Sequence, residues 1–432
     1  MKEVVFDELQ EKIYTETLDN GLKVVILPKR GYSKTFVTFT TKYGSIDRTF
    51  KPHGKDGFIT VPDGIAHFLE HKMFEKEDGD VFQKFSLNGA SANAYTTFGR
   101  TAYLFSATNK VKENTKVLLD FVQEPYFTKQ TVDKEKGIIA QEITMYDDQP
   151  DWRLYFGSIE NLYENHPVKI DIAGTVESIQ DITAEHLYTC YETFYHPSNM
   201  LLFIVGSVDP QEMMAFVKED QAMKTFHVPE PIERKFPSEP NHADIPARTL
   251  TMDVSKPKLN IGMKCNAVDQ QGQEMLETEL SANLVLDSLF GRTSPFYEKA
   301  NDEGLIDESF SYEFSMEEGY GFAMVGSDTD EPERLEKLIK QTIQDAKDNW
   351  PVAKEDLDRM RRKKIGQFMR SLNSIEFIAN QYTRYEFNEM NLFDVVPTLE
   401  KLSMDKLKQA FSTFSDDQNY TIFKVMPPAG EQ

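Results

Sequence analysis

The pattern of hydrophobic and polar residues runs through the same order of elements twice, with a period of roughly half the chain. Each half opens with two strand-like runs and a helix, continues with two more strands and two helices, and closes with a helix–strand unit. The matched segments are residues 17–28 and 247–254, 34–47 and 258–269, 64–74 and 279–291, 91–109 and 308–328, 113–125 and 331–348, 130–148 and 354–373, and 183–208 and 403–428. The sequence therefore predicts two α+β domains of similar topology, each a mostly antiparallel sheet covered by helices.

A stretch rich in proline and charge, residues 228–246, has little periodicity and separates the two halves. The length of 432 residues also exceeds what one hydrophobic core usually serves. We therefore predict an N-terminal domain over residues 1–227, a linker over 228–246 and a C-terminal domain over 247–432.

The charge of the chain makes some classes of binding partner unlikely. The chain has 71 acidic and 48 basic residues, a formal net charge of -23, which argues against binding to nucleic acid or to anionic membranes. The first residues contain no apolar run typical of a secretory signal, and the longest apolar stretch, 200–208, is too short to span a bilayer. The only two cysteines, Cys190 and Cys265, show no metal-binding or disulfide spacing. We expect a cytoplasmic protein.

The segment GIAHFLEHKMF, residues 64–74, carries the clearest chemical signal. His67 and His71 are four residues apart, so on a helix they lie about 40° and about 6 Å from each other and can point at one ion. Neutral imidazoles suit zinc. Glu70 lies on the flank of that face, where a carboxylate could hold a water molecule. An ordinary amphipathic helix with solvated histidines is the alternative; its core face would be Ile65, Phe68 and Leu69.

A catalytic zinc normally takes three protein ligands, so a third must come from another element. Glu135 and Glu142 are seven residues apart and share one face of the predicted helix over 130–148. One of them could bind zinc while the other supports the ligands. The spacing does not distinguish them, and surface salt bridges are the alternative role for each.

Three segments resemble the pitrilysin-type inverted zincins, the family of insulysin and the mitochondrial processing peptidases. They are AHFLEHKMF (66–74) with its H-x-x-E-H order, GASANAYTTFGRTAYLF (89–105) and EKGIIAQEI (135–143). Together with the duplicated α+β plan, the resemblance covers essentially the whole chain. It is similar in particular to Gram-positive cytoplasmic proteins usually described as zinc proteases.

The resemblance implies a zinc-dependent endopeptidase acting on short or unfolded peptides. It implies that His67, His71 and Glu142 bind Zn²⁺, that Glu70 is the general base, and that Glu135 is the supporting carboxylate.

The resemblance also implies how the peptide substrate binds. The substrate would add as a strand to the edge formed by residues 91–98, with Asn93 and Ala94 contacting its backbone. Phe74 would line a pocket beside the scissile bond, although packing in the core is an equal alternative for this residue.

The second half lacks the corresponding residues. If Phe74 matches Phe290, then Asn283, Leu286 and Asp287 stand opposite His67, Glu70 and His71, so we predict no metal site in the second domain.

Active relatives also carry an Arg and a Tyr in this half, in a pattern such as R-E-K-x-G-L-x-Y, and they close a chamber from four such domains. Here Ala300 and Asp307 occupy the positions of the Arg and the Tyr. We therefore expect a heterodimer in which a homologous subunit supplies the pair. The alternative is a homodimer in which Arg292 or Tyr297 substitutes.

Two further functions fit the same fold. One is a non-catalytic assembly subunit, as in the core proteins of respiratory complexes, and the other is a subunit that processes one peptide precursor.

The remaining histidines carry little signal: two precede proline, which indicates turns, and four have no metal-binding spacing. The first two are His166 and His196, and the other four are His53, His186, His227 and His242.

Overall fold

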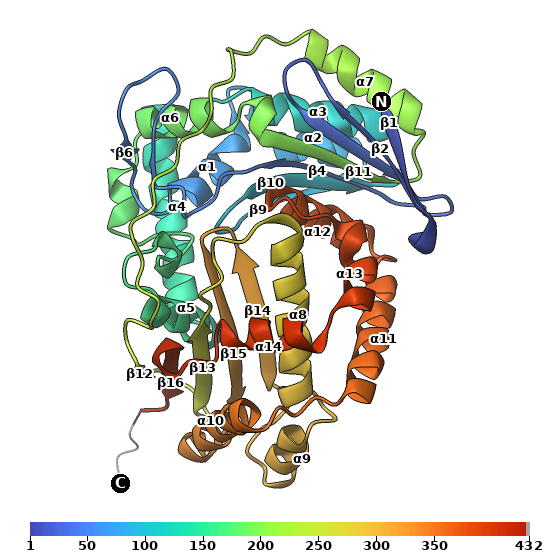
Figure 1. Ribbon diagram of the computed structural model, residues 1–432. Coiled ribbons are helices and arrows are strands. Elements are labelled where there is room, and N and C mark those ends of the chain that lie inside the picture. Colours follow the sequence, from blue (N-terminus) through green and yellow to red (C-terminus); the bar gives the residue numbers. More distant parts are fainter. Residues whose placement is uncertain (429–432) are drawn as a thin grey trace. The chain divides into compact units, whose positions relative to one another are not determined.

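The computed structural model describes residues 1–428 and divides into two compact units (Figure 1). The first unit consists of Met1–Thr144, Ile170–Phe236 and Ser371–Phe387. The second consists of Met145–Lys169, Pro237–Arg370 and the chain from Asn388 onward. Between residues 1 and 428, no helix is long and apolar enough to cross a membrane.

The first unit contains a seven-stranded sheet in the order β1-β2-β3-β11-β4-β10-β9. Strands β3 and β11 are parallel and the other neighbours are antiparallel. Asn20-Gly21 forms the turn between β2 and β3, with Gly21 at φ +87°. The strands of this sheet are β1 (Lys2–Phe6), β2 (Glu11–Thr17), β3 (Lys23–Pro28), β4 (Thr35–Thr41), β9 (Ala90–Thr96), β10 (Thr101–Ala107) and β11 (Met200–Gly206).

The second unit contains a five-stranded sheet in the order β12-β16-β13-β15-β14. Its parallel pair, β12 and β16, occupies the same place in the order as β3 and β11. The two sheets therefore share five strands of one topology, which confirms the predicted duplicated α+β fold. The strands are β12 (Ala247–Thr251), β13 (Lys258–Lys264), β14 (Ser311–Glu317), β15 (Tyr320–Asp328) and β16 (Tyr420–Met426).

Helices cover both sheets. In the first unit they are α1 (Ile65–Met73), α2 (Val81–Leu87), α3 (Val111–Gln123), α4 (Lys129–Asp147), α6 (Ala184–Phe194), α7 (Pro210–Ala222) and α12 (Ile375–Phe387). In the second they are α5 (Pro150–Leu162), α8 (Gly272–Phe290), α9 (Pro295–Asp302), α10 (Pro332–Asp348), α11 (Lys354–Ser371), α13 (Val395–Lys401) and α14 (Met404–Ser412).

The remaining elements are short. Two-stranded pairs form between β5 (Thr49–Phe50) and β6 (Ile59–Thr60) and between β7 (Glu75–Lys76) and β8 (Gly79–Asp80). The 3-10 helices are η1 (Asp7–Leu9), η2 (Pro167–Lys169), η3 (Ser178–Asp181), η4 (Pro197–Asn199), η5 (Leu392–Asp394) and η6 (Asp417–Asn419).

One helix from each half of the sequence packs against the sheet built from the other half. Helix α12 covers β4 and β11, where the ring of Tyr382 lies 4.9 Å from that of Phe203. Helix α5 covers β13 and β16, where Gly157 admits the ring of Phe423; a Cβ at Gly157 would lie 2.3 Å from it. The compact units therefore differ from the division by sequence at 227 and 247, because these helices bury their apolar faces in the other half.

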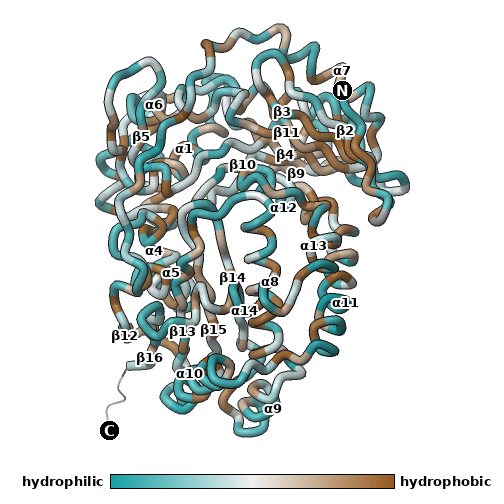
Figure 2. Tube along the Cα trace, in the orientation of Figure 1, coloured by the Kyte–Doolittle hydropathy of each residue, from teal (hydrophilic) through white to brown (hydrophobic). Residues whose placement is uncertain are grey.

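The centre of the first unit's sheet is its most apolar part, as the brown central strands in Figure 2 show. Every residue of β4 and of β11 is buried. Strand β11 has the continuous apolar run, MLLFIVG, that is typical of a strand buried on both faces, whereas β4 (TFVTFTT) buries threonines between its apolar residues. This sheet provides the rigid support for α1.

Helix α1 begins in a way that the sequence did not reveal. In the sequence, Pro62-Asp63 directly before this segment predicts an N-terminal cap. In the structure the N-cap is Gly64, at φ +85° and without a side-chain cap. Asp63 instead pairs with Arg48 at 2.6 Å. A Cβ on Gly64 would lie 2.3 Å from the carbonyl oxygen of Ala173. The cap prediction is wrong because a close backbone contact, rather than a carboxylate, sets the start of the helix.

Replacing Gly64 by alanine should therefore destabilise the first unit. The change combines an unfavourable backbone conformation with a steric clash, so we expect a loss of about 3 kcal/mol in the free energy of unfolding. Gly57→Ala is the matched control, because Gly57 has φ +89° but no atom within 4 Å of the added methyl group, and about 1 kcal/mol is expected there. Urea denaturation followed by circular dichroism measures both; equal midpoints would contradict the account.

Candidate active site

Helix α1 carries both histidines of the H-x-x-E-H motif on one face. Ile65, Phe68 and Leu69 on the opposite face are buried in the core. The His67 and His71 rings lie 4.6 Å apart between centroids, with side chains only 12% and 25% exposed. The amphipathic alternative is thus right about the core face and wrong about solvated histidines.

Helix α4 brings Glu142 to both histidines. Glu142 Oε1 lies 3.8 Å from His67 Nε2, and its Oε2 lies 3.4 Å from His71 Nε2. One ligand atom from each of the three residues falls within 4.8 Å of the others, and no other group of His, Cys, Asp or Glu in residues 1–428 meets this condition. Ligands of a tetrahedral zinc ion lie about 3.3 Å from one another. The three residues therefore fit a zinc ion with modest adjustment.

Glu135, on the same face of α4, contacts the other nitrogen of His71. Its Oε1 lies 3.1 Å from His71 Nδ1 and can accept a hydrogen bond from it. That bond leaves the lone pair of Nε2 directed toward the Glu142 side. This is the arrangement by which a carboxylate fixes the tautomer of a metal-binding histidine.

The protonation of the two histidines suits a cation. Burial, with help from neighbouring His71, lowers the pKa of His67 to about 3, so its imidazole is neutral and has a free lone pair. Burial alone would lower the pKa of His71, but the hydrogen bond to Glu135 and the nearby carboxylates raise it overall. The negative charge of these carboxylates, which raises the pKa of His71, would also favour a divalent metal ion beside it.

Glu70 lies beside the candidate ligands and is 8% exposed. Burial raises its pKa, while a hydrogen bond from Thr96 Oγ1 to its Oε2, at 2.7 Å, acts in the opposite direction. A carboxylate with a raised pKa at a metal site can accept a proton from water and then release it.

Strand β9 forms one edge of the first unit's sheet, beyond β10. Asn93 and Ala94 lie on this strand, opposite Leu104 and Tyr103. The Ala94 N–H donates to the side-chain Oδ1 of Asn93 at 2.9 Å. The Asn93 side chain thus accepts a hydrogen bond that the Ala94 N–H could otherwise donate to an added strand.

Phe74, at the end of α1, is 8% exposed. Its ring stacks on that of Phe82, with centroids 4.3 Å apart, and also contacts Phe121 at 5.0 Å. Core packing accounts for Phe74, and the partly exposed face of this pair belongs to Phe82. A role for Phe74 in lining a pocket remains a prediction.

In the second unit, the positions matched to the histidine helix carry an ion pair. Asp287 accepts a hydrogen bond from Tyr312 at 2.7 Å and pairs with Lys363 of α11 at 2.8 Å. Ala300 is buried, and Asp307 pairs with Lys256 at 2.9 Å. In the second unit, therefore, a lysine of α11 contacts the matched helix α8, whereas in the first unit a glutamate of α4 contacts α1.

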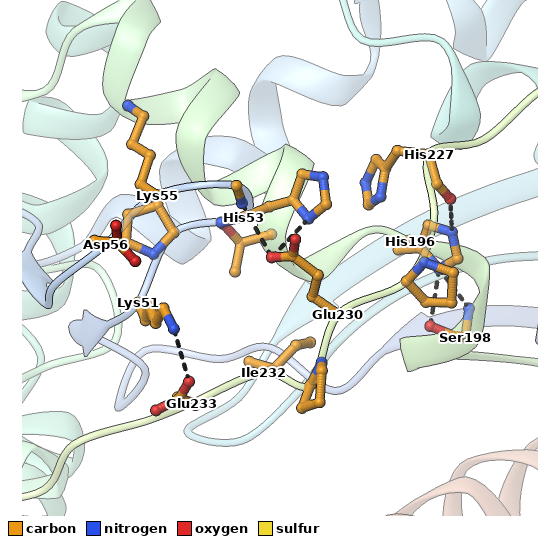
Figure 3. Close-up of a pocket in the computed structure, with 15 residues that line it drawn as sticks. Lys51, His53, Lys55, Asp56, His196, Ser198, His227, Glu230, Ile232 and Glu233 are labelled. Carbon is orange, nitrogen blue, oxygen red and sulfur yellow. Dashed lines mark hydrogen bonds and ion pairs between the residues drawn. The ribbon is translucent and has the colours of Figure 1, made fainter.

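The fold assembles a second histidine cluster in the first unit, which has no local pattern in the sequence. His53, His196 and His227 line a cavity of about 350 Å³ (Figure 3). His53 stacks on His227 with centroids 3.7 Å apart, and its Nδ1 lies 3.4 Å from Glu230 Oε2. Both ring nitrogens of His227 face carbonyl oxygens at 3.1 Å. Stacked rings direct their lone pairs along parallel planes, so this cluster does not converge on an ion.

Comparisons with known proteins give family matches in both halves of the chain. Residues 61–176 match the model of the insulinase family (peptidase family M16), and residues 181–364 match the M16 inactive domain. The chain is 52% identical to the uncharacterized zinc protease YmfH of Bacillus subtilis (strain 168) over 427 residues, 99% of each chain.

Two solved structures share the fold. An M16-like peptidase from Alicyclobacillus acidocaldarius is 39% identical, with a TM-score of 0.94 and coverage of 98% of this chain and 100% of that one. Pitrilysin is 15% identical with a TM-score of 0.79, and the match covers 100% of this chain but 47% of the pitrilysin chain.

The purified protein should bind one zinc ion per chain, and removing a ligand should abolish that binding. We expect His67→Ala and Glu142→Ala to lose stoichiometric zinc, because two remaining ligands hold the ion poorly. His242→Ala, at an exposed histidine, is the control and should keep it. Elemental analysis by mass spectrometry measures the metal content. Zinc-free wild-type protein, prepared without chelators, would contradict the site.

Glu135→Gln should weaken zinc binding rather than abolish it. The amide can still accept from His71 Nδ1 but carries no charge, so we expect a loss of about 10- to 100-fold in affinity. Asp133→Asn removes an exposed carboxylate of the same helix and should have little effect. Titration against a chromophoric chelator gives the affinities. A loss as complete as that of Glu142→Ala would instead make Glu135 a ligand.

Proposed function

Because the chain belongs to the M16 (insulinase) family of peptidases, we propose that it is a zinc-dependent endopeptidase that hydrolyses short or unfolded peptides. The observation that carries the proposal is the convergence of His67, His71 and Glu142 within 4.8 Å, with buried Glu70 beside them. These are the residue types that such hydrolysis requires, in a geometry that fits the metal.

In this mechanism the chain's own residues bind, orient and move protons. A zinc ion bound by the three ligands would polarise the scissile carbonyl and lower the pKa of water. Glu70 takes the proton from the attacking water and passes it to the leaving amine. Glu135 holds His71 by Nδ1 and keeps Nε2 turned toward Glu142.

The peptide binds by adding a strand to β9. Main-chain hydrogen bonds supply the affinity in such β-augmentation, so an extended and unfolded segment is the natural substrate. When the peptide binds, the Ala94 N–H leaves the side-chain oxygen of Asn93 and donates to a carbonyl of the peptide instead. Its amide can then contact the peptide backbone directly.

Full activity requires a partner in this proposal. The positions where relatives carry the Arg and Tyr hold Ala300, which is buried, and Asp307, which is paired with Lys256. Neither side chain can donate a hydrogen bond to a substrate carbonyl. We therefore propose a heterodimer with a homologous subunit that supplies the pair, in the cytoplasm; a homodimer using Arg292 or Tyr297 is the alternative.

A non-catalytic assembly role is less well supported, because His67, Glu70, His71 and Glu142 are all present and the three candidate ligands lie together. Processing of one dedicated precursor would use the same site and differs only in the choice of substrate.

Glu70→Gln tests the catalytic role directly. The variant should retain stoichiometric zinc and lose at least about 100-fold in the cleavage rate of a quenched-fluorescent peptide, because the amide cannot take a proton. Both proteins are assayed with and without extract of the source cells, which supplies the partner. We expect both proteins to contain zinc, and only the wild type, in the presence of extract, to cleave the peptide.

Two outcomes would change the proposal. Cleavage by Glu70→Gln at the wild-type rate would contradict the role of Glu70. Cleavage by the isolated chain at ordinary enzymatic rates, roughly 1–10³ per second, would remove the need for a heterologous partner.

A further inference from the structure

Thr96, the last residue of β9, holds the carboxylate of Glu70. Its Oγ1 donates to Glu70 Oε2 at 2.7 Å, a bond from the edge strand to the histidine helix. A carboxylate is only an acceptor when ionised, so the proton of this bond belongs to Thr96. The bond is therefore charge-assisted and among the stronger types.

The surroundings of Thr96 leave its proton for Glu70. The hydroxyl of buried Thr101 lies 3.4 Å away, but Thr101 donates its own proton to the carbonyl of Tyr43 at 2.9 Å. Thr96 thus has one strong acceptor within reach. The bond engages Oε2 and so restricts the rotation of the Glu70 carboxylate.

We propose that Thr96 is a positioning residue that fixes the orientation of Glu70 and couples it to the strand where the peptide binds. This inference rests on the proposed peptidase function. Because Thr96 belongs to the strand to which the peptide would add, its hydroxyl links that strand to the general base. The coupling should therefore act on the chemical step more than on substrate binding.

The neighbouring Thr97 provides a matched control, because the strand β9 ends at Thr96, short of the end of the predicted edge over residues 91–98, and Thr97 lies in the turn before β10. Its hydroxyl donates to the carbonyl of Arg100 and accepts from the Arg100 N–H, both at 3.2 Å. These bonds close the turn between β9 and β10 and do not reach the site. A threonine that serves the hairpin alone therefore lies beside the one that contacts Glu70.

The experiment compares Thr96→Val, Thr96→Ser and Thr97→Val in the full chain, loaded with zinc and assayed with cell extract. The readouts are kcat and KM for a quenched-fluorescent peptide, zinc content, and the anisotropy of a labelled, uncleavable peptide. For Thr96→Val we expect kcat to fall by about 10- to 100-fold. Zinc content should not change, and KM and the peptide Kd should stay within about twofold, since the ligands and the edge backbone remain.

Rescue separates positioning from packing. Thr96→Ser keeps the hydroxyl and should recover most of kcat, whereas Thr97→Val should leave kcat near the wild-type value. Wild-type kcat in Thr96→Val, a parallel loss of zinc or of peptide affinity, or failure of serine to restore activity would each overturn the proposal. If the wild type binds zinc but cleaves no peptide, the proposed function fails, and the role of Thr96 fails with it.

Discussion

The hydrogen bond between His71 Nδ1 and Glu135 joins the two helices on which the candidate centre depends. Helix α1 supplies both histidines and Glu70, and α4 supplies Glu142, so their relative position decides whether three ligands can meet. The apolar face of α1 packs in the core and holds this helix in place. The bond to Glu135 then holds the His71 ring relative to α4, because it sets both the tautomer and the direction of the ring.

The second unit shows what the same topology does without this interaction. Its corresponding helix carries Asp287, which pairs with Lys363 and accepts a bond from Tyr312. An aspartate paired with a lysine satisfies its charge and gives a metal ion no advantage. Two sheets that share five strands of one topology thus carry different candidate ligands through a few side chains, as expected where function depends on sites rather than folds.

Much of this arrangement could be predicted from the sequence, for identifiable reasons. The duplicated order of elements along the chain follows from hydrophobic periodicity, and the face shared by His67 and His71 follows from helix geometry. Spacing placed Glu135 and Glu142 on one face, but only the fold shows which nitrogen of His71 each approaches.

What could not be predicted depends on long-range contacts. The exchange of α5 and α12 between the sheets depends on packing partners such as Phe423 and Phe203, far away in the chain. The start of α1 at Gly64 depends on the Ala173 backbone, and the Thr96 bond on the register of β9. The cluster of His53, His196 and His227 draws on three separate segments and has no local pattern.

The most direct test of the central claim is a crystal structure of the zinc-loaded protein with anomalous data collected across the zinc absorption edge. We expect one anomalous peak between His67, His71 and Glu142, at about 2.0–2.2 Å from each ligand atom, with Glu135 on His71 Nδ1 and Glu70 outside the ligand set. A peak at the His53 and His227 cavity, or none between the three ligands, would contradict it.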